Sequence, residues 1–365
     1  MNVATQRCAI LIGILLAGMA SSPAALSAAA GRPDRQMQAE LPTTPLVDLR
    51  VAAVPVSGWA PQYIAFERGY FRDVGLNVEL VPFTNASESL PALAQGQLHV
   101  GTCANAIACF NALTRGSELQ IVADQQSAGK TERSTGSVAL VARRDLWDAG
   151  AIRGASDLIG RTVYNPGVRG AGPFIDVSHW LRRNGVDPQS VDFTQMPFPD
   201  QFAAMQNAAI EVGFQTEPLI SAGLARGAHQ VLATIEEMHP GGQILSLAFW
   251  SGIERMGPMV GERFMVAYLR GARDYINAFE YGVDQDVIVD ILTRSTTIRD
   301  SAVLRQMRYS WVDPNGVVGR ASLEGDVALL RDLGIVPTVI DLGPAFVDKY
   351  RQFAVQYLGE YQPPR

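Results

Sequence analysis

The side chains best suited to chemistry lie in short loops that follow apolar, strand-like runs. Trp59 can stack on a flat solute or cover an aliphatic one, and Gly58 lets the backbone approach that solute closely. Arg169 stands between glycines ahead of an expected helix, where a guanidinium and free N–H groups would clamp a carboxylate, sulfonate or phosphate. Glu217 can bind an amine or cap the helix that begins at Pro218. These residue types predict that the chain binds a small solute.

Polar side chains occupy the other loops of this kind. Thr102 and Asn105 follow a strand-like run that ends at Gly101, and each can hydrogen-bond a solute or cap the next helix. Asn165 and Gln195 end two later strand-like runs. The residues expected to bind the solute are Ser57, Gly58, Trp59, Thr102, Asn105, Asn165, Arg169, Gly170, Gln195 and Glu217. Three aromatic side chains are candidates for apolar walls of the site or for the core: Phe83, Phe198 and Trp250.

Several other chemistries lack their sequence patterns. The four histidines are scattered along the sequence, at His99, His179, His229 and His239. None has a cysteine or a second histidine at metal-ligand spacing, so neither a metal site nor a cofactor is expected. The chain has no G-x-S-x-G nucleophile elbow, and the glycine loop at 166–172 lacks the Gly-Lys-Ser/Thr ending of a phosphate-binding P-loop.

Two cysteines follow the expected export signal, Cys103 and Cys109. Their separation of six residues does not place them together on one helix, and it matches no metal motif. Two buried free thiols are the favoured prediction, and a disulfide is the alternative that export would permit.

A repeated order of strands and helices positions the loops. Strand-like runs at 49–54, 77–81 and 98–101 alternate with helical segments. The same order recurs with strands at 161–165, 191–195 and 210–214. Two similar α/β units predict two lobes with mostly parallel sheets, whose strand-to-helix loops share one edge. Because ligands of open α/β sheets bind at that edge, the expected site is a cleft between the lobes.

Composition and termini set the expected location. The chain has 365 residues, 47% of them hydrophobic, and a formal net charge of −6, which favours a packed protein and argues against nucleic-acid binding. Residues 1–30 have the charged start, short apolar stretch and small-residue end of a signal peptide, which predicts a periplasmic protein. Residues 31–46 are expected to be a disordered lead-in. No other stretch is apolar and long enough to cross a bilayer.

The expected domain limits follow the two lobes. Lobe one comprises 47–140 and 246–365, and includes helices near the C-terminus that pack on it. Lobe two comprises 141–245. The chain is expected to cross between the lobes near 138–142 and again near 244–250, where apolar runs are flanked by polar residues.

Several segments resemble periplasmic solute-binding proteins of the nitrate/sulfonate/taurine type. The similarity lies in Phe66-Glu67-Arg68-Gly69-Tyr70-Phe71 with Gly75-Leu76-Asn77-Val78, in 94–101, in Asp157-Leu158-Ile159-Gly160-Arg161-Thr162-Val163 and in 208–218. Each motif alone is weak, but their order and spacing agree over roughly 49–248. The resemblance implies a type II periplasmic-binding fold.

The resemblance also implies a function. It predicts the extracytoplasmic solute-binding component of an ABC importer, a monomer that captures a small organic anion and delivers it to an inner-membrane permease. A sulfonate, a carboxylate or an aromatic acid is the expected solute. One alternative is an enzyme similar to those of pyrimidine-precursor synthesis, but Lys130 and Lys349, the two lysines, lie outside the expected cleft loops. Another alternative is a partner that reports the solute to a sensor.

Overall fold

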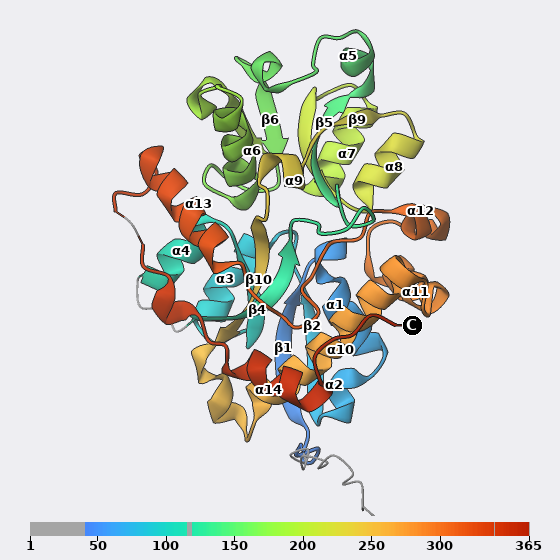
Figure 1. Cartoon of the computed structure of the whole chain (residues 1–365), viewed down its shortest axis with the longest axis vertical. Helices are drawn as coiled ribbons and strands as arrows, with labels where there is room; N and C mark the ends of the chain where they lie inside the picture. Colours follow the sequence, from blue (N-terminus) through green and yellow to red (C-terminus); the bar gives the residue numbers. More distant parts are fainter. Residues whose placement is uncertain (1–40, 115–118, 339, 365) are drawn as a thin grey trace, which may run out of the picture. The chain divides into compact units, whose positions relative to one another are not determined.

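The computed structural model describes residues 41–114, 119–338 and 340–364, which belong to one compact unit (Figure 1). The expected signal peptide, and the lead-in up to residue 40, lie outside the described residues. Residues 41–46 form neither helix nor strand, and the first strand begins at Val47. None of the described helices combines the length and the apolar character that a membrane span requires.

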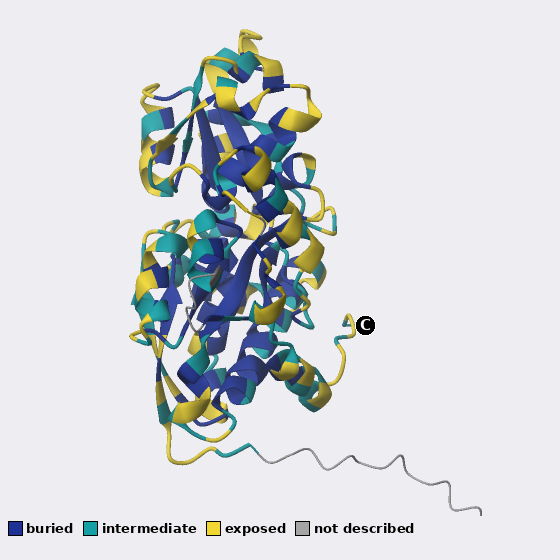
Figure 2. Cartoon of the chain, turned by 90° about the vertical axis from the view of Figure 1, so that its left-hand side faces the viewer, coloured by how far each residue is buried: buried dark blue, intermediate teal, exposed yellow. Residues whose placement is uncertain are grey.

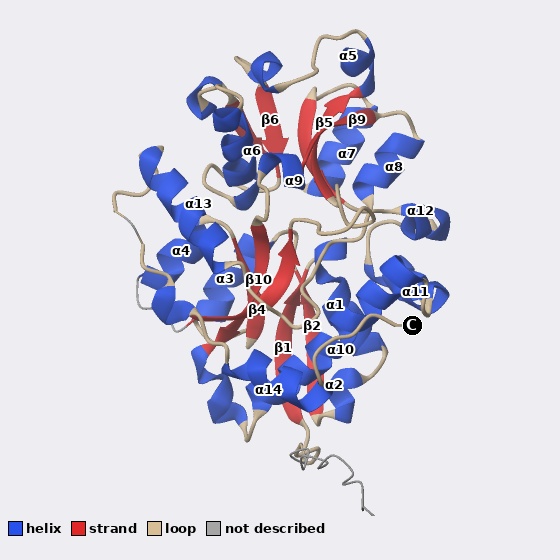
Figure 3. Cartoon of the chain, in the orientation of Figure 1, coloured by secondary structure: helices blue, strands red, loops and turns tan. Residues whose placement is uncertain are grey.

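Two five-stranded sheets form the framework (Figure 3). In spatial order, the first sheet contains β2 (Leu76–Pro82), β1 (Val47–Ala53), β3 (Val100–Ala104), β10 (Gln243–Trp250) and β4 (Leu119–Ser127). The second contains β7 (Asp192–Gln195), β6 (Thr162–Asn165), β8 (Val212–Thr216), β5 (Val138–Arg143) and β9 (His229–Thr234). The two orders follow one pattern, in which the first strand of a β/α unit lies between its second and third strands. This agrees with the repeat in the sequence and with a two-lobed α/β fold.

Both sheets are mixed, and in each of them four strands run in one direction and one runs against them, which confirms the prediction of mostly parallel sheets. The strand β1 is parallel to β2 and β3, and β6 is parallel to β7 and β8. In contrast, β10 runs antiparallel to β3 and β4, and β5 runs antiparallel to β8 and β9. Each of these two strands enters its sheet from the other lobe, and it therefore runs against its neighbours.

The strand pairing also places the crossings between the lobes. Because β5 pairs only with strands of the second sheet, residues 138–140 lie in lobe two, although the sequence assigns them to lobe one. The first crossing therefore precedes Val138. The second lies between Thr234, where β9 ends, and Gln243, where β10 begins. The return strand itself belongs to lobe one, as expected for most of its length.

Helices cover the faces of both sheets (Figure 1). Around lobe one lie α1 (Ala60–Glu67), α2 (Tyr70–Asp73), α3 (Ala86–Ala94) and α4 (Ile107–Thr114). Lobe two contains α5 (Arg144–Asp148), α6 (Gly172–Arg183), α7 (Phe198–Gln206), α8 (Leu219–Ala225) and α9 (Ile235–Met238). The C-terminal part forms α10 (Val260–Tyr281), α11 (Gln285–Ser295), α12 (Ser301–Gln306), α13 (Arg320–Asp332) and α14 (Lys349–Leu358).

The C-terminal helices do not pack on lobe one alone. As expected, α10 packs against α1 and α14 in lobe one. However, α12 contacts α8 and α13 contacts α6, and both of these partners belong to lobe two. The C-terminal region therefore joins the lobes as well as stiffening the first one. Figure 2 shows the central strands of both sheets buried and exposed residues on the helices and loops around them, while the edge strands β2 and β7 are partly exposed.

The two cysteines form a disulfide, so the prediction of free thiols is wrong. Cys103 lies near the end of β3 and Cys109 in the first turns of α4, with their Cα atoms 5.5 Å apart. The chain reverses direction between the strand and the helix, which brings the two side chains together. Sequence separation alone could not show this reversal.

Candidate functional site

A cavity of about 90 Å³ lies between the carboxyl ends of the strands of both lobes. Lobe one supplies Val54, Trp59 and Asn105, which come directly after β1 and β3. Lobe two supplies residues at the ends of β6 and β8 and at the start of α6 and α7. These are Pro166, Gly167, Gly172, Asp176, Phe198, Phe214 and Thr216. The cavity therefore lies where the repeat in the sequence predicts a ligand site.

Hydrogen bonds hold the lobes together around this cavity. The side-chain Nδ2 of Asn105 donates to Oδ1 of Asp176 over 2.9 Å. The backbone N–H of Ile107 donates to the carbonyl of Gly170 over 2.8 Å, and that of Ser57 to the carbonyl of Glu217 over 3.3 Å. Each bond joins a loop or helix start of lobe one to a loop or helix of lobe two, so the structure shows the lobes in contact.

Asp176 is the charged residue that the sequence analysis missed. It lies one turn inside α6, and its side chain is fully buried. Its Oδ1 accepts from Asn105 and from Nδ1 of His239, both over 2.9 Å, whereas among the described residues nothing donates to its Oδ2. A signal was present, because this aspartate interrupts the buried apolar face formed by Phe174, Ile175 and Val177.

Three polar atoms of the cavity lining lack a hydrogen-bond partner in the described part of the chain. These are Nε1 of Trp59, Oδ1 of Asn105 and Oδ2 of Asp176. A buried polar group without a partner costs about 1–3 kcal/mol, so a solute that reached one of these atoms would gain a hydrogen bond there. One donor and two acceptors of this kind belong to residues of a lining that is otherwise largely apolar.

The expected site residues fall into two groups in the structure. Trp59 and Asn105 line the cavity. Gly170 takes part in the contact between the lobes. Its φ of +87° favours glycine, and a Cβ added at this position would lie only 2.8 Å from the side chain of Ile107 in lobe one. Among the aromatic candidates, Phe198 lines the cavity, while Trp250 packs beside Gly252 in lobe one.

Three other expected residues, Ser57, Gly58 and Thr102, form hydrogen bonds near the residues that line the cavity. The hydroxyl of Ser57 lies 2.8 Å from that of Ser310. Gln125 accepts a hydrogen bond from Thr102 and donates one to the carbonyl of Gly58. Thr102 is in the middle of β3, so the loop begins later than the sequence suggests.

The expected site residues Asn165, Arg169 and Gln195 of lobe two do not line the cavity. Asn165 is buried, and its Oδ1 accepts the N–H of Gly167 over 3.0 Å, which shapes the loop after β6. Arg169 is exposed, with its guanidinium 5.0 Å from the ring of Phe174. Gln195 is also exposed. In the described part of the chain, no lysine or arginine lines the cavity, so Arg169 does not supply the expected counter-charge.

Glu217 acts as a cap rather than as a cavity residue. It is buried, and its carboxylate accepts from the N–H and the hydroxyl of Ser221 in the first turn of α8, and from the N–H of Arg308. Burial raises the pKa of Glu217 to about 7, although these hydrogen bonds oppose the rise. The sequence is compatible with both capping and amine binding by Glu217, and these contacts support capping.

The raised pKa predicts a pH-dependent stability. In the unfolded chain Glu217 ionises near its usual pKa of about 4.5, whereas in the folded protein it holds its proton up to about pH 7. Between these values only the unfolded state loses the proton, so the free energy of unfolding falls as the pH rises, by about 1–3 kcal/mol. We expect Glu217→Gln to flatten this slope in denaturation curves recorded from pH 5 to pH 8. The exposed Glu324→Gln control should keep the slope, and an equal slope in both variants would contradict the assignment.

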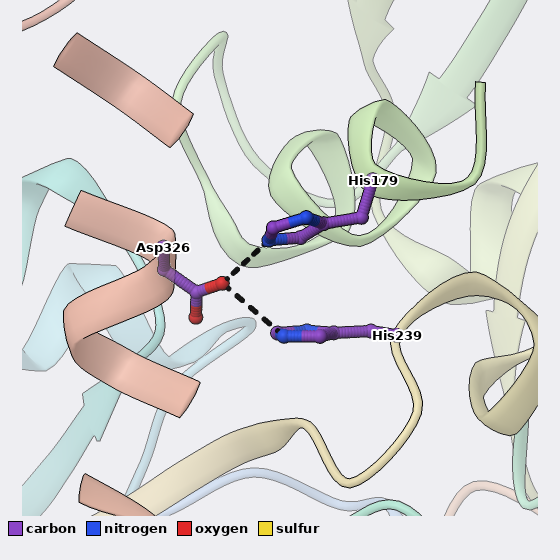
Figure 4. Close-up of side chains that lie close together, drawn as sticks. All are labelled: His179, His239 and Asp326. Carbon is purple, nitrogen blue, oxygen red and sulfur yellow. Dashed lines mark hydrogen bonds and ion pairs between the residues drawn. The ribbon is translucent and has the colours of Figure 1, made fainter. Parts of the chain in front are cut away.

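Two of the four histidines meet in space, although the sequence separates them widely (Figure 4). The rings of His179 and His239 are stacked with their centroids 4.4 Å apart, and both face the carboxylate of Asp326. The expectation that the histidines are scattered is therefore wrong for this pair. Their partner lies on α13, a helix that the sequence analysis did not identify.

Comparison with known proteins supports the fold. No curated protein matches the chain in sequence. Among solved structures, a protein of Bordetella bronchiseptica RB50 is 19% identical, with a TM-score of 0.68 over 86% of this chain and 98% of that one. The alkanesulfonate-binding protein SsuA from Xanthomonas axonopodis pv. citri, bound to MOPS, is 15% identical, with a TM-score of 0.66 over 83% of this chain and 98% of that one.

A third similar structure is the periplasmic nitrate-binding protein NrtA from Synechocystis PCC 6803. It is 13% identical, with a TM-score of 0.70 over 86% of this chain and 89% of that one. These likenesses show the periplasmic-binding fold. The model of the NMT1-like family matches residues 43–248, which is more than half of the chain and includes both β/α units. The chain belongs to the NMT1-like family.

Proposed function

We propose that this protein is the extracytoplasmic solute-binding component of an ABC importer. As a monomer in the periplasm, it closes its two lobes on a small solute and presents the closed form to an inner-membrane permease. The observation that carries the proposal is the cavity between the lobes, lined by strand ends of both sheets and bridged by the hydrogen bond from Asn105 to Asp176. The family and the binding proteins of the same fold support it.

The same cavity supports binding without catalysis. Its lining contains the hydroxyls of Ser87 and Thr216, but among the described residues no histidine or lysine joins them there as a base. The carboxylate of Asp176 is bound to Asn105 and His239 rather than to a hydroxyl. A solute would therefore be held and not altered.

The size of the cavity limits the solute. An apolar cavity of about 150 Å³ just holds benzene, and this cavity measures about 90 Å³. We therefore propose an aliphatic solute with about four or five non-hydrogen atoms. Its apolar part would contact Trp59 of lobe one and Phe198 and Phe214 of lobe two, which all line the cavity.

The charged and polar groups around the cavity indicate which polar group the solute would carry. The N-terminus of α6 faces the cavity and carries about half a positive charge, which by itself favours an anion. Asp176 brings a carboxylate from the same helix; its Oδ1 is paired with His239, and its Oδ2 has no hydrogen-bond partner among the described residues. Because a carboxylate oxygen accepts N–H donors and disfavours a second anion, we propose a solute with an N–H-rich polar end, neutral or cationic, in place of the expected organic anion.

Three solutes of nearly equal shape but different charge test this proposal. Propionamidine, propionamide and propionate differ in charge but hardly in size, and their affinities can be compared by calorimetry. We expect propionamidine to bind about tenfold or more tightly than propionate, because a hydrogen bond to a charged group contributes about 1.5–3 kcal/mol. Tighter binding of propionate, or of a small sulfonate, would contradict the charge assignment. If no small solute raised the melting temperature, the binding function itself would fail.

A further inference from the structure

Three side chains from three distant segments meet beside the cavity (Figure 4). His179 lies on α6 of lobe two, His239 on the crossing between β9 and β10, and Asp326 on α13. Nε2 of His179 lies 2.9 Å from Oδ1 of Asp326, and Nε2 of His239 lies 3.3 Å from the same oxygen. One donor atom from each residue lies within 4.8 Å of the others.

These distances match the edges of a zinc coordination sphere. Zinc bonds to histidine nitrogen and carboxylate oxygen are about 2.0–2.2 Å long, so two ligands of a tetrahedral ion lie about 3.3 Å apart. The separations of 2.9 Å and 3.3 Å from Asp326 lie at or slightly below this value, whereas the two histidine nitrogens, which lie within 4.8 Å of each other, would have to move closer together. Two histidines and one carboxylate also leave a fourth position, near which the hydroxyl of Ser322 lies 3.2 Å from Nε2 of His239.

A second carboxylate prepares His239 for this role. Nδ1 of His239 lies 2.9 Å from Oδ1 of Asp176, which fixes the ring and holds the proton on Nδ1. Nε2, the nitrogen facing Asp326, is then the one that can bind a metal. Zinc sites commonly contain a carboxylate that accepts a hydrogen bond from the second nitrogen of a metal-binding histidine. This contact orients the ring and raises the affinity of the histidine for the metal.

The charges of the cluster leave a place for a cation, which would replace the imidazole N–H groups as the partner of Asp326. Asp176 and Asp326 are both fully buried, and in the described part of the chain neither Oδ2 has a hydrogen-bond partner. Buried carboxylates are stable only when a positive charge or enough donors accompany them. The side chain of His179 is 26% exposed, which leaves a path for an ion from solvent.

The geometry points to a divalent zinc site formed by His179, His239 and Asp326, with Asp176 as the residue that orients His239. The ion would replace the protons between the two Nε2 atoms and the carboxylate. Because α6 belongs to lobe two and α13 packs on lobe one, the ion joins the lobes. Asp176 and His179 are one turn apart on α6, so the same ion fixes the helix that reaches the cavity.

The test measures zinc binding directly, without any solute. The chelator-treated protein, free of any histidine tag, is titrated with Zn²⁺ by calorimetry and followed by its melting temperature. We expect one equivalent to bind, the melting temperature to rise, and His179→Gln to weaken binding at least about tenfold. His179 is suitable because it is partly exposed, and His99→Gln is a matched control in lobe one, because His99 contacts Arg50 and Trp250 and not the cluster.

Cobalt provides a second measurement that requires no variant. Co²⁺ bound by two histidines and a carboxylate in a four-coordinate site gives intense visible absorption, and we expect Zn²⁺ to displace it with a stoichiometry of one. Wild-type protein without this absorption, or with zinc affinity equal to that of His179→Gln, would overturn the proposal. Equal losses in His179→Gln and His99→Gln would overturn it as well.

Discussion

Replacing Gly172 with valine is expected to hold the two lobes apart and to weaken solute binding by a hundredfold or more. A Cβ at Gly172 would lie 2.2 Å from Oδ1 of Asn105, which is far inside van der Waals contact. Asn105 cannot turn away freely, because it is buried and its Nδ2 is bound to Asp176 across the cavity. The methyl groups of valine extend the clash, and relief requires separation of the lobes.

The fold of each lobe should survive this change, because the clash lies between lobes and Gly172 begins a helix with ordinary backbone angles. Calorimetry with propionamidine measures the affinity, and small-angle X-ray scattering measures the radius of gyration, which should increase. Gly154→Val is the matched control in lobe two, since a Cβ there meets nothing within 4 Å. Wild-type affinity in Gly172→Val would show that the cavity is not the binding site.

Asp176→Asn is expected to reverse the order of affinities in the propionamidine series. Asparagine keeps the oxygen that accepts from Asn105 and from His239, so both hydrogen bonds can persist. The change falls on Oδ2, the atom without a partner among the described residues, where an acceptor becomes a donor and the charge is lost. Propionamidine should bind about tenfold to a hundredfold more weakly, and propionate more tightly.

This variant separates the charge of Asp176 from its packing. Calorimetry on wild type and variant with all three solutes gives the change in preference, which a general loss of stability would not produce. Asp200→Asn is a suitable control, because Asp200 is an exposed residue of α7 in the same lobe. If both variants retained the wild-type order, Asp176 would not face the solute.

The sequence was informative about whatever depends on local pattern. Apolar runs and glycines predicted β1, β2 and β6 to within two residues, and their recurrence predicted two lobes with facing edges. Trp59 and Asn105 were expected in the site for the same reason, since a loop after a strand end of an α/β sheet lies at the ligand edge, and both line the cavity. The antiparallel direction of β5 was not predictable, because it depends on how the chain enters the second sheet after it crosses from lobe one.

The rest of the site depends on contacts between distant segments. Asp176 lies inside a helix, so a search of loops passed over it, while Arg169 lies in the expected loop but is turned to solvent beside Phe174. His179, His239 and Asp326 come together only through the packing of α13 against α6. No spacing in the sequence encodes that contact.

The most direct test of the account is the distance between the lobes with and without solute. Spin labels at Thr84→Cys and Val168→Cys would lie on exposed loops after β2 and β6, while Cys103 and Cys109 are paired in a disulfide. Pulsed electron paramagnetic resonance should show one short, narrow distance with saturating propionamidine, and a longer, broader distribution without it. Identical distributions in both conditions, while calorimetry shows binding, would contradict closure of the lobes on the solute.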